Sequence, residues 1–288
     1  MYMKFLVTGS KGQLGTALHD ALEEILPGCT VYTDVDELDI TDTKALEDFI
    51  LLHDISVVIN CAAYTAVDLA ETESALCYKL NSDAVTGLAS VASKLGVRVL
   101  HISTDYVFDG MSNIPYRESD KVNPLSNYGA SKRKGEVSLL AMCPDAIIIR
   151  TSWLYSNVGR NFVNTMLRLG QERSVLTVVS DQIGTPTYAG DLADAIVKIL
   201  TARQWLPGIY HYSNEGVCSW YDFAKAIHRF AGLTQCRIIP VNSDDYTAQA
   251  QRPHFSVLDK SLIKKTFGIE IPYWADSLEK CMKIIAKK

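Results

Sequence analysis

An apolar strand runs directly into three evenly spaced glycines near the start of the chain, in Phe5-Leu6-Val7-Thr8-Gly9-Ser10-Lys11-Gly12-Gln13-Leu14-Gly15. Apolar residues then recur at helical spacing, at Leu14, Leu18 and Leu22, which predicts an amphipathic helix. A strand, a glycine-rich turn and a helix in this order are typical of a dinucleotide-binding fold, where a pyrophosphate meets the helix N-terminus. The spacing Gly-x-x-Gly-x-x-Gly differs from the common Gly-x-Gly-x-x-Gly fingerprint, so a plain glycine turn is the alternative interpretation.

Four further apolar runs predict strands at 30–33, 56–60, 97–103 and 146–150. The run Val57-Val58-Ile59 has no polar alternation, as expected for a parallel strand that is buried on both faces. Helices are expected between these strands, including one from about residue 71 to 95 and one that carries residues 128–140. We therefore predict an α/β fold, a Rossmann-type doubly wound parallel sheet.

The second half of the sequence is less regular. Helices are expected near 161–170, 191–200, 220–231, 260–267 and from 274, with strands at 175–179 and 209–212. We expect a dinucleotide-binding domain over 1–155 that returns at about 188–212. A smaller, interleaved substrate-binding lobe would then consist of 156–187 and 213–288.

An acidic residue, Asp34, ends the second predicted strand about 20 residues after the last glycine. A carboxylate at this position can bind the adenosine ribose hydroxyls and repels a 2′-phosphate, and no arginine stands beside it. NADH is therefore favoured over NADPH as the cofactor. Asp36 and Glu37 are competing candidates for the same role.

A phenol and an amine four residues apart, Tyr128 and Lys132, share one face of a predicted helix. An ammonium group beside the phenol would lower the pKa of Tyr128 from its usual value of about 10 and make it a general acid near neutral pH. A Tyr-x-x-x-Lys pair alone is more often an ordinary solvent-facing pair. Its meaning therefore depends on the rest of the chain.

Composition narrows the classes of protein. The chain has 288 residues, a formal charge of −5 and 48% hydrophobic residues, which indicates a soluble globular protein. The sequence has no basic cluster, so nucleic acid is not expected as a partner. It has no apolar run of about 18 residues, so a membrane is not expected as a partner either. The seven cysteines are scattered and form no Cys-x-x-Cys pair, which favours a reducing cytoplasm and argues against structural zinc.

Two residues with potential chemistry are interpreted as packing residues. His101 lies inside the strand 97–103, and Cys61 follows the strand 56–60 without a basic neighbour in the sequence. We expect a buried core histidine and a small core filler, respectively.

Several strings together resemble the extended short-chain dehydrogenase/reductases, namely Gly9-x-x-Gly12-x-x-Gly15, Asn60-Cys61-Ala62-Ala63, Ser103-Thr104-Asp105 and Tyr128-x-x-x-Lys132. Longer strings are similar to the dTDP-4-dehydrorhamnose reductase family, namely Ala62 to Asp68, Ser103 to Gly110, Arg150 to Tyr155, Asn161-Phe162, Asp181-Gln182-x-Gly184-x-Pro186-Thr187 and Arg252-Pro253. The resemblance covers essentially the whole chain.

The resemblance implies roles for individual residues. Tyr128 would be the proton donor, Lys132 would hold the nicotinamide ribose and tune Tyr128, and Thr104 would bind the reacting sugar oxygen. Asp105 and Trp153 would contact the dTDP-sugar, although Trp153 has a core aromatic as its alternative interpretation. The binding site for NADH or NADPH would be lined by Gly9, Gly12, Gln13, Leu14, Gly15, Asp34, Asp39, Ile40, Ala63, Tyr64, Thr65, Ile102, Tyr128 and Lys132.

The implied reaction is reduction of the C4 ketone of dTDP-4-dehydro-L-rhamnose to dTDP-L-rhamnose, a precursor of cell-surface polysaccharide. Another sugar-nucleotide epimerase, dehydratase or reductase is one alternative, although a dehydratase would carry a glutamate where Tyr106 stands. A non-catalytic, nucleotide-binding regulatory subunit is the other, and the presence of Thr104, Tyr128 and Lys132 argues against it. Members of the family differ in dimerisation and in metal use at the dimer interface. A homodimer is an open expectation, and no metal-ligand cluster is evident in the sequence.

Overall fold

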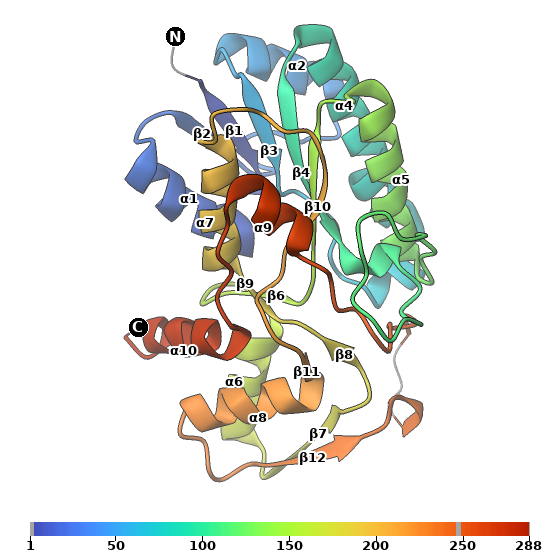
Figure 1. Cartoon of the computed structure of the whole chain (residues 1–288), viewed down its shortest axis with the longest axis vertical. Helices are drawn as coiled ribbons and strands as arrows, with labels where there is room; N and C mark the ends of the chain where they lie inside the picture. The colour runs from blue at the N-terminus through green and yellow to red at the C-terminus, as the bar shows by residue number, and fades with distance from the viewer. Residues whose placement is uncertain (1–2, 246–248, 288) are drawn as a thin grey trace.

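The computed structural model describes residues 3–245 and 249–287. Its centre is a six-stranded parallel sheet with the strand order β10-β5-β4-β3-β1-β2 (Figure 1). These strands are β1 Phe5–Thr8, β2 Thr30–Thr33, β3 Val57–Asn60, β4 Arg98–Thr104, β5 Ile147–Thr151 and β10 Gly208–His211. The order reverses between β1 and β3, so a crevice is expected outside the carboxyl ends of these strands. The predicted α/β fold with a parallel sheet is confirmed.

Helices cover both faces of this sheet (Figure 1). One face packs against α1 Gln13–Ile25, α7 Ala189–Leu200 and α9 Ser261–Phe267. The other face packs against α2 Thr43–Leu52, α4 Ala84–Leu95 and α5 Asn127–Met142. Two apolar clusters therefore enclose the strands, which explains their continuous apolar sequences.

The helix expected over 71–95 is divided into several pieces. A 3-10 turn, η1 Leu69–Glu71, precedes α3 Ser74–Tyr78, and a π-helical turn, η2 Lys79–Asp83, joins α3 to α4. Within η2 the side chain of Asn81 accepts a hydrogen bond from the backbone N–H of Tyr64 and donates one to its carbonyl oxygen, at 2.9 and 3.0 Å. This pairing fixes the π-turn against the loop after β3, and π-turns often lie near functional sites.

A smaller part of the molecule lies below the sheet in Figure 1. It contains α6 Phe162–Glu172, α8 Trp220–Phe230, α10 Trp274–Ile285 and the parallel pair β7 Val175–Val179 and β12 Arg237–Val241. The sequence did not predict β12, because its short run Arg237-Ile238-Ile239-Pro240-Val241 contains a proline. The remaining short elements are β6 Leu154–Tyr155, β8 Ile183–Gly184, β9 Thr187–Tyr188, β11 Cys218–Ser219, η3 Asp105–Val107 and η4 Ser243–Asp245.

One helix of the C-terminal segment packs with the sheet. Ile263 of α9 and Ile269 just after it belong to the same core cluster as α1 and α7, although residues 213–288 were expected in the smaller lobe. The last part of the chain therefore contacts both regions, since α10 packs in the core of α6 and α8.

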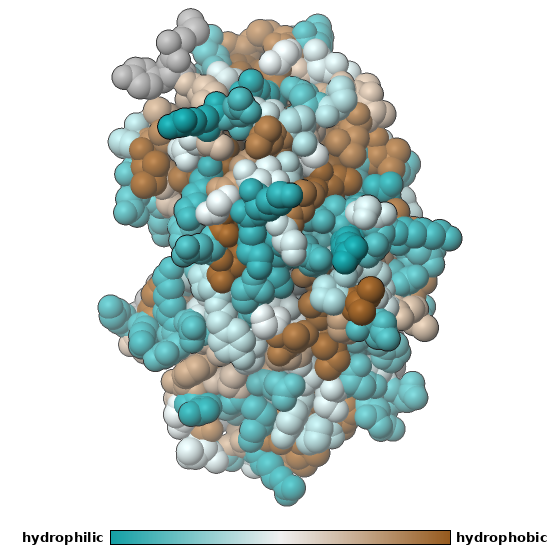
Figure 2. Space-filling model, in the orientation of Figure 1, coloured by the Kyte–Doolittle hydropathy of each residue, from teal (hydrophilic) through white to brown (hydrophobic). Residues whose placement is uncertain are grey.

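The surface in Figure 2 is covered mostly by hydrophilic residues, with small hydrophobic patches between them. Within residues 3–245 and 249–287, no helix is long and apolar enough to cross a bilayer.

Candidate active site

A cavity of about 890 Å³ lies at the carboxyl ends of β1, β3, β4 and β5. Its lining includes every predicted site residue except Tyr64, which is buried and donates its hydroxyl to Glu73 at 2.7 Å. The predicted residues that line it are Gly9, Gly12, Gln13, Leu14, Gly15, Asp34, Asp39, Ile40, Ala63, Thr65, Ile102, Thr104, Asp105, Tyr128, Lys132 and Trp153. One cavity thus brings together residues that lie more than 140 positions apart in the sequence.

The glycine-rich turn forms a cradle in which side chains do not fit. Gly9 has φ +65°, and a Cβ there would lie 2.8 Å from the backbone nitrogen of Ala62. A Cβ on Gly15 would lie 2.4 Å from the carbonyl oxygen of Gly9. Gly12 is the N-cap of α1 and makes no side-chain capping bond, so the first turn, whose residues line the cavity, has no side-chain acceptor for its N–H groups at the cap. This arrangement fits the pyrophosphate of a dinucleotide.

The acidic residues after β2, namely Asp34, Asp36 and Glu37, surround the cation Lys11, which was not predicted from the sequence. Asp34 accepts backbone N–H groups from Lys11 at 3.0 Å and Val35 at 2.9 Å. The ammonium group of Lys11 lies 2.9 Å from a carboxylate oxygen of Glu37 and 3.0 Å from one of Asp36. These two carboxylates raise the pKa of Lys11, so it stays protonated where it lines the cavity.

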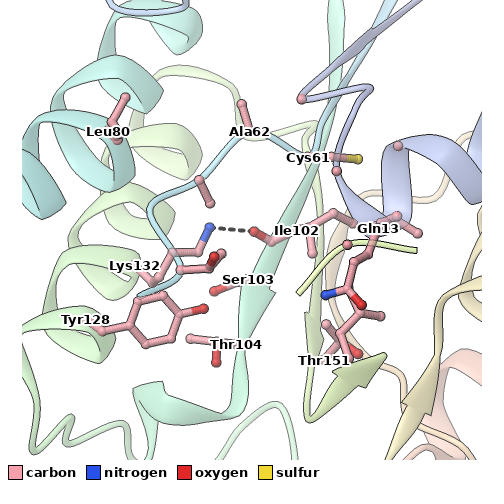
Figure 3. Close-up of a pocket in the computed structure, with 18 of the residues that line it drawn as sticks. Gln13, Cys61, Ala62, Leu80, Ile102, Ser103, Thr104, Tyr128, Lys132 and Thr151 are labelled. Atoms are coloured by element: carbon pink, nitrogen blue, oxygen red, sulfur yellow. Dashed lines mark hydrogen bonds between the residues drawn. The ribbon is translucent and has the colours of Figure 1, made fainter. Parts of the chain in front are cut away.

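Tyr128 and Lys132 come from α5, and Thr104 ends β4 (Figure 3). Ser126 caps α5 by accepting the N–H of Gly129 at 3.1 Å, which fixes the first turn that carries Tyr128. Lys132 is only 2% exposed, and its ammonium donates to the carbonyl oxygen of Ile102 at 2.6 Å. The phenol, the amine and the threonine hydroxyl therefore face one region of the cavity.

The expected lowering of the Tyr128 pKa is wrong for this structure. Burial raises the pKa of Tyr128 above its usual range, and the hydroxyl of Thr104 opposes that rise only in part. Burial also lowers the pKa of Lys132 to about 8, against the opposing charge of Glu136. The ammonium is directed to Ile102 rather than to the phenol, so desolvation determines the protonation of Tyr128.

Asp105 follows Thr104 and is buried in the same region. Its carboxylate accepts the hydroxyl hydrogen of Thr104 at 3.0 Å, and burial raises its pKa to about 7. Near neutral pH this carboxyl group is divided between its protonated and ionised forms, so it can either donate to or accept from a sugar hydroxyl.

Trp153 lines the cavity with an unusual backbone. Its φ is +47°, in the left-handed region that non-glycine residues rarely adopt. Its indole stacks on that of Trp220, with ring centres 3.6 Å apart and an interplanar angle of 10°. Gly184 also packs closely against the Trp153 ring, because a Cβ at residue 184 would lie 2.6 Å from atoms of that ring. No pattern in the sequence paired Trp153 with Trp220.

The two residues interpreted as packing residues lie beside the catalytic candidates. His101 is buried, and its Nε2 is 3.3 Å from the ammonium of Lys132, while its Nδ1 is 3.0 Å from the amide nitrogen of Asn60. Burial holds the pKa of His101 well below its usual range, so the ring is neutral. Cys61 lines the cavity, and burial raises the pKa of its thiol to about 12.

Further lining residues come from segments in which no site residue was predicted. Arg252 donates to Asp68 at 2.6 Å, and Asn161 donates to the side chain of Gln13 at 2.9 Å. Both belonged to strings that carried the family resemblance, but nothing in their spacing placed them at a cavity. The lining residues that were missed include Lys11, Leu38, Ser103, Tyr106, Thr151, Ser152, Arg160, Asn161, Trp220 and Arg252. Among residues 3–245 and 249–287, no group of three or more metal-ligating side chains could hold a metal ion.

Known proteins resemble this chain over nearly its full length. The family described as RmlD substrate binding domain matches residues 3–287. A dTDP-4-dehydrorhamnose reductase from Aggregatibacter actinomycetemcomitans is 41% identical, with 96% of this chain and 97% of the relative covered. A dTDP-4-dehydrorhamnose reductase from Bacillus anthracis, solved in complex with NADP, has a TM-score of 0.93 at 37% identity, with 99% of this chain and 100% of that chain covered. A dTDP-4-keto-6-deoxy-D-glucose reductase from Streptomyces niveus is 35% identical, with 98% of this chain and 97% of the relative covered.

Proposed function

The chain belongs to the RmlD substrate binding domain family, and from this premise we propose that it reduces dTDP-4-dehydro-L-rhamnose to dTDP-L-rhamnose with NADH or NADPH. The observation that carries the proposal is the position of Tyr128, Lys132 and Thr104 in one cavity with the glycine cradle at its other end. A phenol, a buried amine and a hydroxyl around one point suit the protonation of a carbonyl oxygen.

The protein's part in the reaction is proton transfer and charge stabilisation. When bound, the nicotinamide supplies a hydride to C4 of the sugar. Tyr128 gives its phenolic proton to the oxygen at C4 as negative charge develops there. The hydroxyl hydrogen of Thr104, which Asp105 accepts in the described structure, would turn to the same oxygen, and the ammonium of Lys132 stabilises the phenolate that remains.

The residues at the cradle would hold the cofactor. Backbone N–H groups from Gly12 to Leu14 would bind the pyrophosphate, and Asp34 would bind the adenosine ribose. Lys132 would contact the nicotinamide ribose. Asp105 and Trp153 would contact the sugar nucleotide, because they line the same cavity as Thr104.

The direct test is incubation of the purified chain with dTDP-4-dehydro-L-rhamnose and either NADH or NADPH, while the nicotinamide absorbance at 340 nm is followed. Loss of absorbance with formation of dTDP-L-rhamnose supports the proposal. Binding of both ligands without turnover would instead indicate the non-catalytic regulatory subunit.

A second candidate is reduction of a related dTDP-4-keto-6-deoxy sugar, as the name of the Streptomyces niveus relative suggests. The two reactions share the C4 ketone and the dTDP group, so the proposed proton donor serves both. The ratio of kcat/KM for the two sugars under identical conditions decides between them.

The other expectations remain proposals. We propose that residues 1–155 and 188–212 bind mainly the cofactor, while 156–187 and 213–288 bind mainly the sugar nucleotide. We also propose a cytoplasmic location and a homodimer. Cell fractionation and light scattering of the purified chain, respectively, test these two proposals.

A further inference from the structure

A buried ion pair lies directly behind the proposed catalytic residues. The carboxylate of Glu136 and the guanidinium of Arg150 are 0% and 1% exposed, and they meet in two hydrogen bonds of 2.8 Å. The same carboxylate accepts the hydroxyl hydrogen of Ser103 at 2.6 Å and a hydrogen of Arg133 at 2.9 Å. Four donors thus satisfy one buried acidic group.

The partners of Glu136 are the elements that form the site. Glu136 follows Lys132 by four residues on α5, so the two side chains lie one turn apart on the same helix face. Ser103 lies on β4 between Ile102, which accepts the ammonium of Lys132, and Thr104. Arg150 lies on β5 and also stacks over the ring of Phe108 at 5.1 Å. One carboxylate therefore connects α5 to the ends of two neighbouring strands.

Packing alone does not require charges here, because apolar residues of similar volume often replace a buried ion pair without loss of stability. The position of the charge is more informative. The groups around Lys132 are His101 from β4, Cys61 after β3, Cys77 from α3, and Tyr128 and Glu136 from α5. His101 is neutral and the Cys61 thiol stays protonated, so they offer the ammonium no compensating charge near neutral pH. Glu136 supplies that charge.

We propose that Glu136 is a positioning residue for the reduction proposed above, on which this inference rests: it holds β4 against α5 through Ser103, and its negative charge stabilises the ammonium of Lys132. It touches neither cofactor nor substrate, since it does not line the cavity. Arg150 and Arg133 compensate part of its charge and keep the carboxylate ionised.

The test compares two variants with a matched control. Glu136→Gln removes the charge and keeps the shape, but it leaves Arg150 buried without a carboxylate. The double variant Glu136→Gln with Arg150→Met removes both charges, so Arg150 is not left as an unpaired buried charge if the single variant fails to fold. Glu172→Gln is the control, because Glu172 is half-exposed on α6 and pairs only with Arg168 in the described structure.

The readout is the pH dependence of turnover. Loss of the Glu136 charge makes the ammonium of Lys132 less stable, so the alkaline fall in kcat should move to lower pH by about one pH unit. The shift should be largest in Glu136→Gln, smaller in the double variant and absent in Glu172→Gln. The KM for the sugar nucleotide should change less than twofold, because no binding contact is removed. A pH profile identical to wild type in both Glu136 variants, with only lower thermal stability, would show that the pair is merely structural and overturn the inference.

A second measurement is independent of the proposed function. With lysine labelled by ¹³C at Cε, the signal of Lys132, assigned by its loss in Lys132→Met, reports its protonation without any substrate. A titration midpoint that falls in the double variant supports the role of the charge even if the sugar nucleotide is not turned over. An unchanged midpoint refutes that role even in an active enzyme.

Discussion

At the scale of single residues, burial rather than the neighbouring amine determines the proton on Tyr128. The raised pKa of Tyr128 keeps the phenol protonated through the neutral range, which is the state that the reductive direction requires. Lys132, with a pKa of about 8, loses its proton first as the pH rises. The alkaline limit of turnover is therefore expected near that value, rather than at the higher pKa of Tyr128.

Replacement of Tyr128 by phenylalanine tests the proton donor. The ring keeps its packing while its proton is lost, so kcat should fall by roughly 10²–10⁴-fold, the usual scale of general acid catalysis. Cofactor affinity should survive, because the contact expected from Lys132 is intact. Steady-state kinetics and a direct measurement of NADH binding check this. If kcat is near normal while chemistry limits the rate, Tyr128 is not the acid.

Asp105 offers a test of burial through stability. Its pKa of about 7 lies above the value of about 3.9 expected in the unfolded chain, so the folded state binds its proton more tightly. The stabilisation from this proton is complete below pH 4 and is lost as the pH rises to 7. At pH 8 the free energy of unfolding of Asp105→Asn, measured by urea unfolding, should therefore exceed that of wild type by roughly 1–4 kcal/mol. At pH 4.5 the two should differ little. The exposed Asp36→Asn is the control, and an equal gain at both pH values would contradict the explanation.

The carboxylate of Asp34 and the nearby ammonium of Lys11 carry the opposite charges that should decide cofactor choice. Asp34→Ala should weaken NADH binding and relatively favour NADPH, because it removes a ribose acceptor and a charge that repels the 2′-phosphate. The ammonium of Lys11, which pairs with Asp36 and Glu37, would then be the nearby cation available to a 2′-phosphate. Dissociation constants for both cofactors check this. If both are affected equally, Asp34 does not bind the ribose, and Asp36 is the next candidate.

At the scale of elements, local sequence predicted most of the sheet and its helices but not the π-turn η2. The strands follow from the apolar runs that lie within each segment, and α1 follows from its helical periodicity. The π-turn depends on Asn81 pairing with the backbone of Tyr64, which lies 17 residues earlier in the chain. It also depends on Gly135 of α5, where a Cβ would lie 2.2 Å from the carbonyl oxygen of Asn81. Such contacts arise only when two elements pack, so no local pattern indicates them.

Gly135→Ala tests this contact between α5 and η2. The added methyl group cannot be accommodated without moving backbone, so the free energy of unfolding should fall by about 1–3 kcal/mol, despite the better helix propensity of alanine. Because Lys132 is one turn away, kcat should fall as well. Urea unfolding and kinetics check both effects. Val137→Ala, on the half-exposed face of the same helix, is the control and should change neither by much.

At the scale of the whole molecule, the sequence predicted the part of the cavity around the glycine-rich turn better than the part around Trp153. Gly9 to Gly15 and Asp34 belong to one strand–turn–helix–strand unit, so their spacing alone places them together. The other part combines Thr104, Trp153, Trp220 and Arg252, which come from separate parts of the chain. Their meeting depends on how the C-terminal elements pack against the sheet. Only the family resemblance, and not local patterning, brought Trp153 to attention.

The stacked indoles of Trp153 and Trp220 give the final test, because they join the loop after β5 to the start of α8. Trp153→Ala should raise the KM for the sugar nucleotide and leave cofactor affinity nearly unchanged. Trp220→Ala should have the same effect more weakly, since the indole of Trp153 remains but loses the ring on which it stacks. Near-ultraviolet circular dichroism should lose the same signal in both variants. Trp205→Phe, at the opposite end of the sheet beside Asp145, is the control for the optical change. If Trp153→Ala lowers the thermal stability but leaves KM unchanged, the pair is part of the core, and the substrate must bind elsewhere in the cavity.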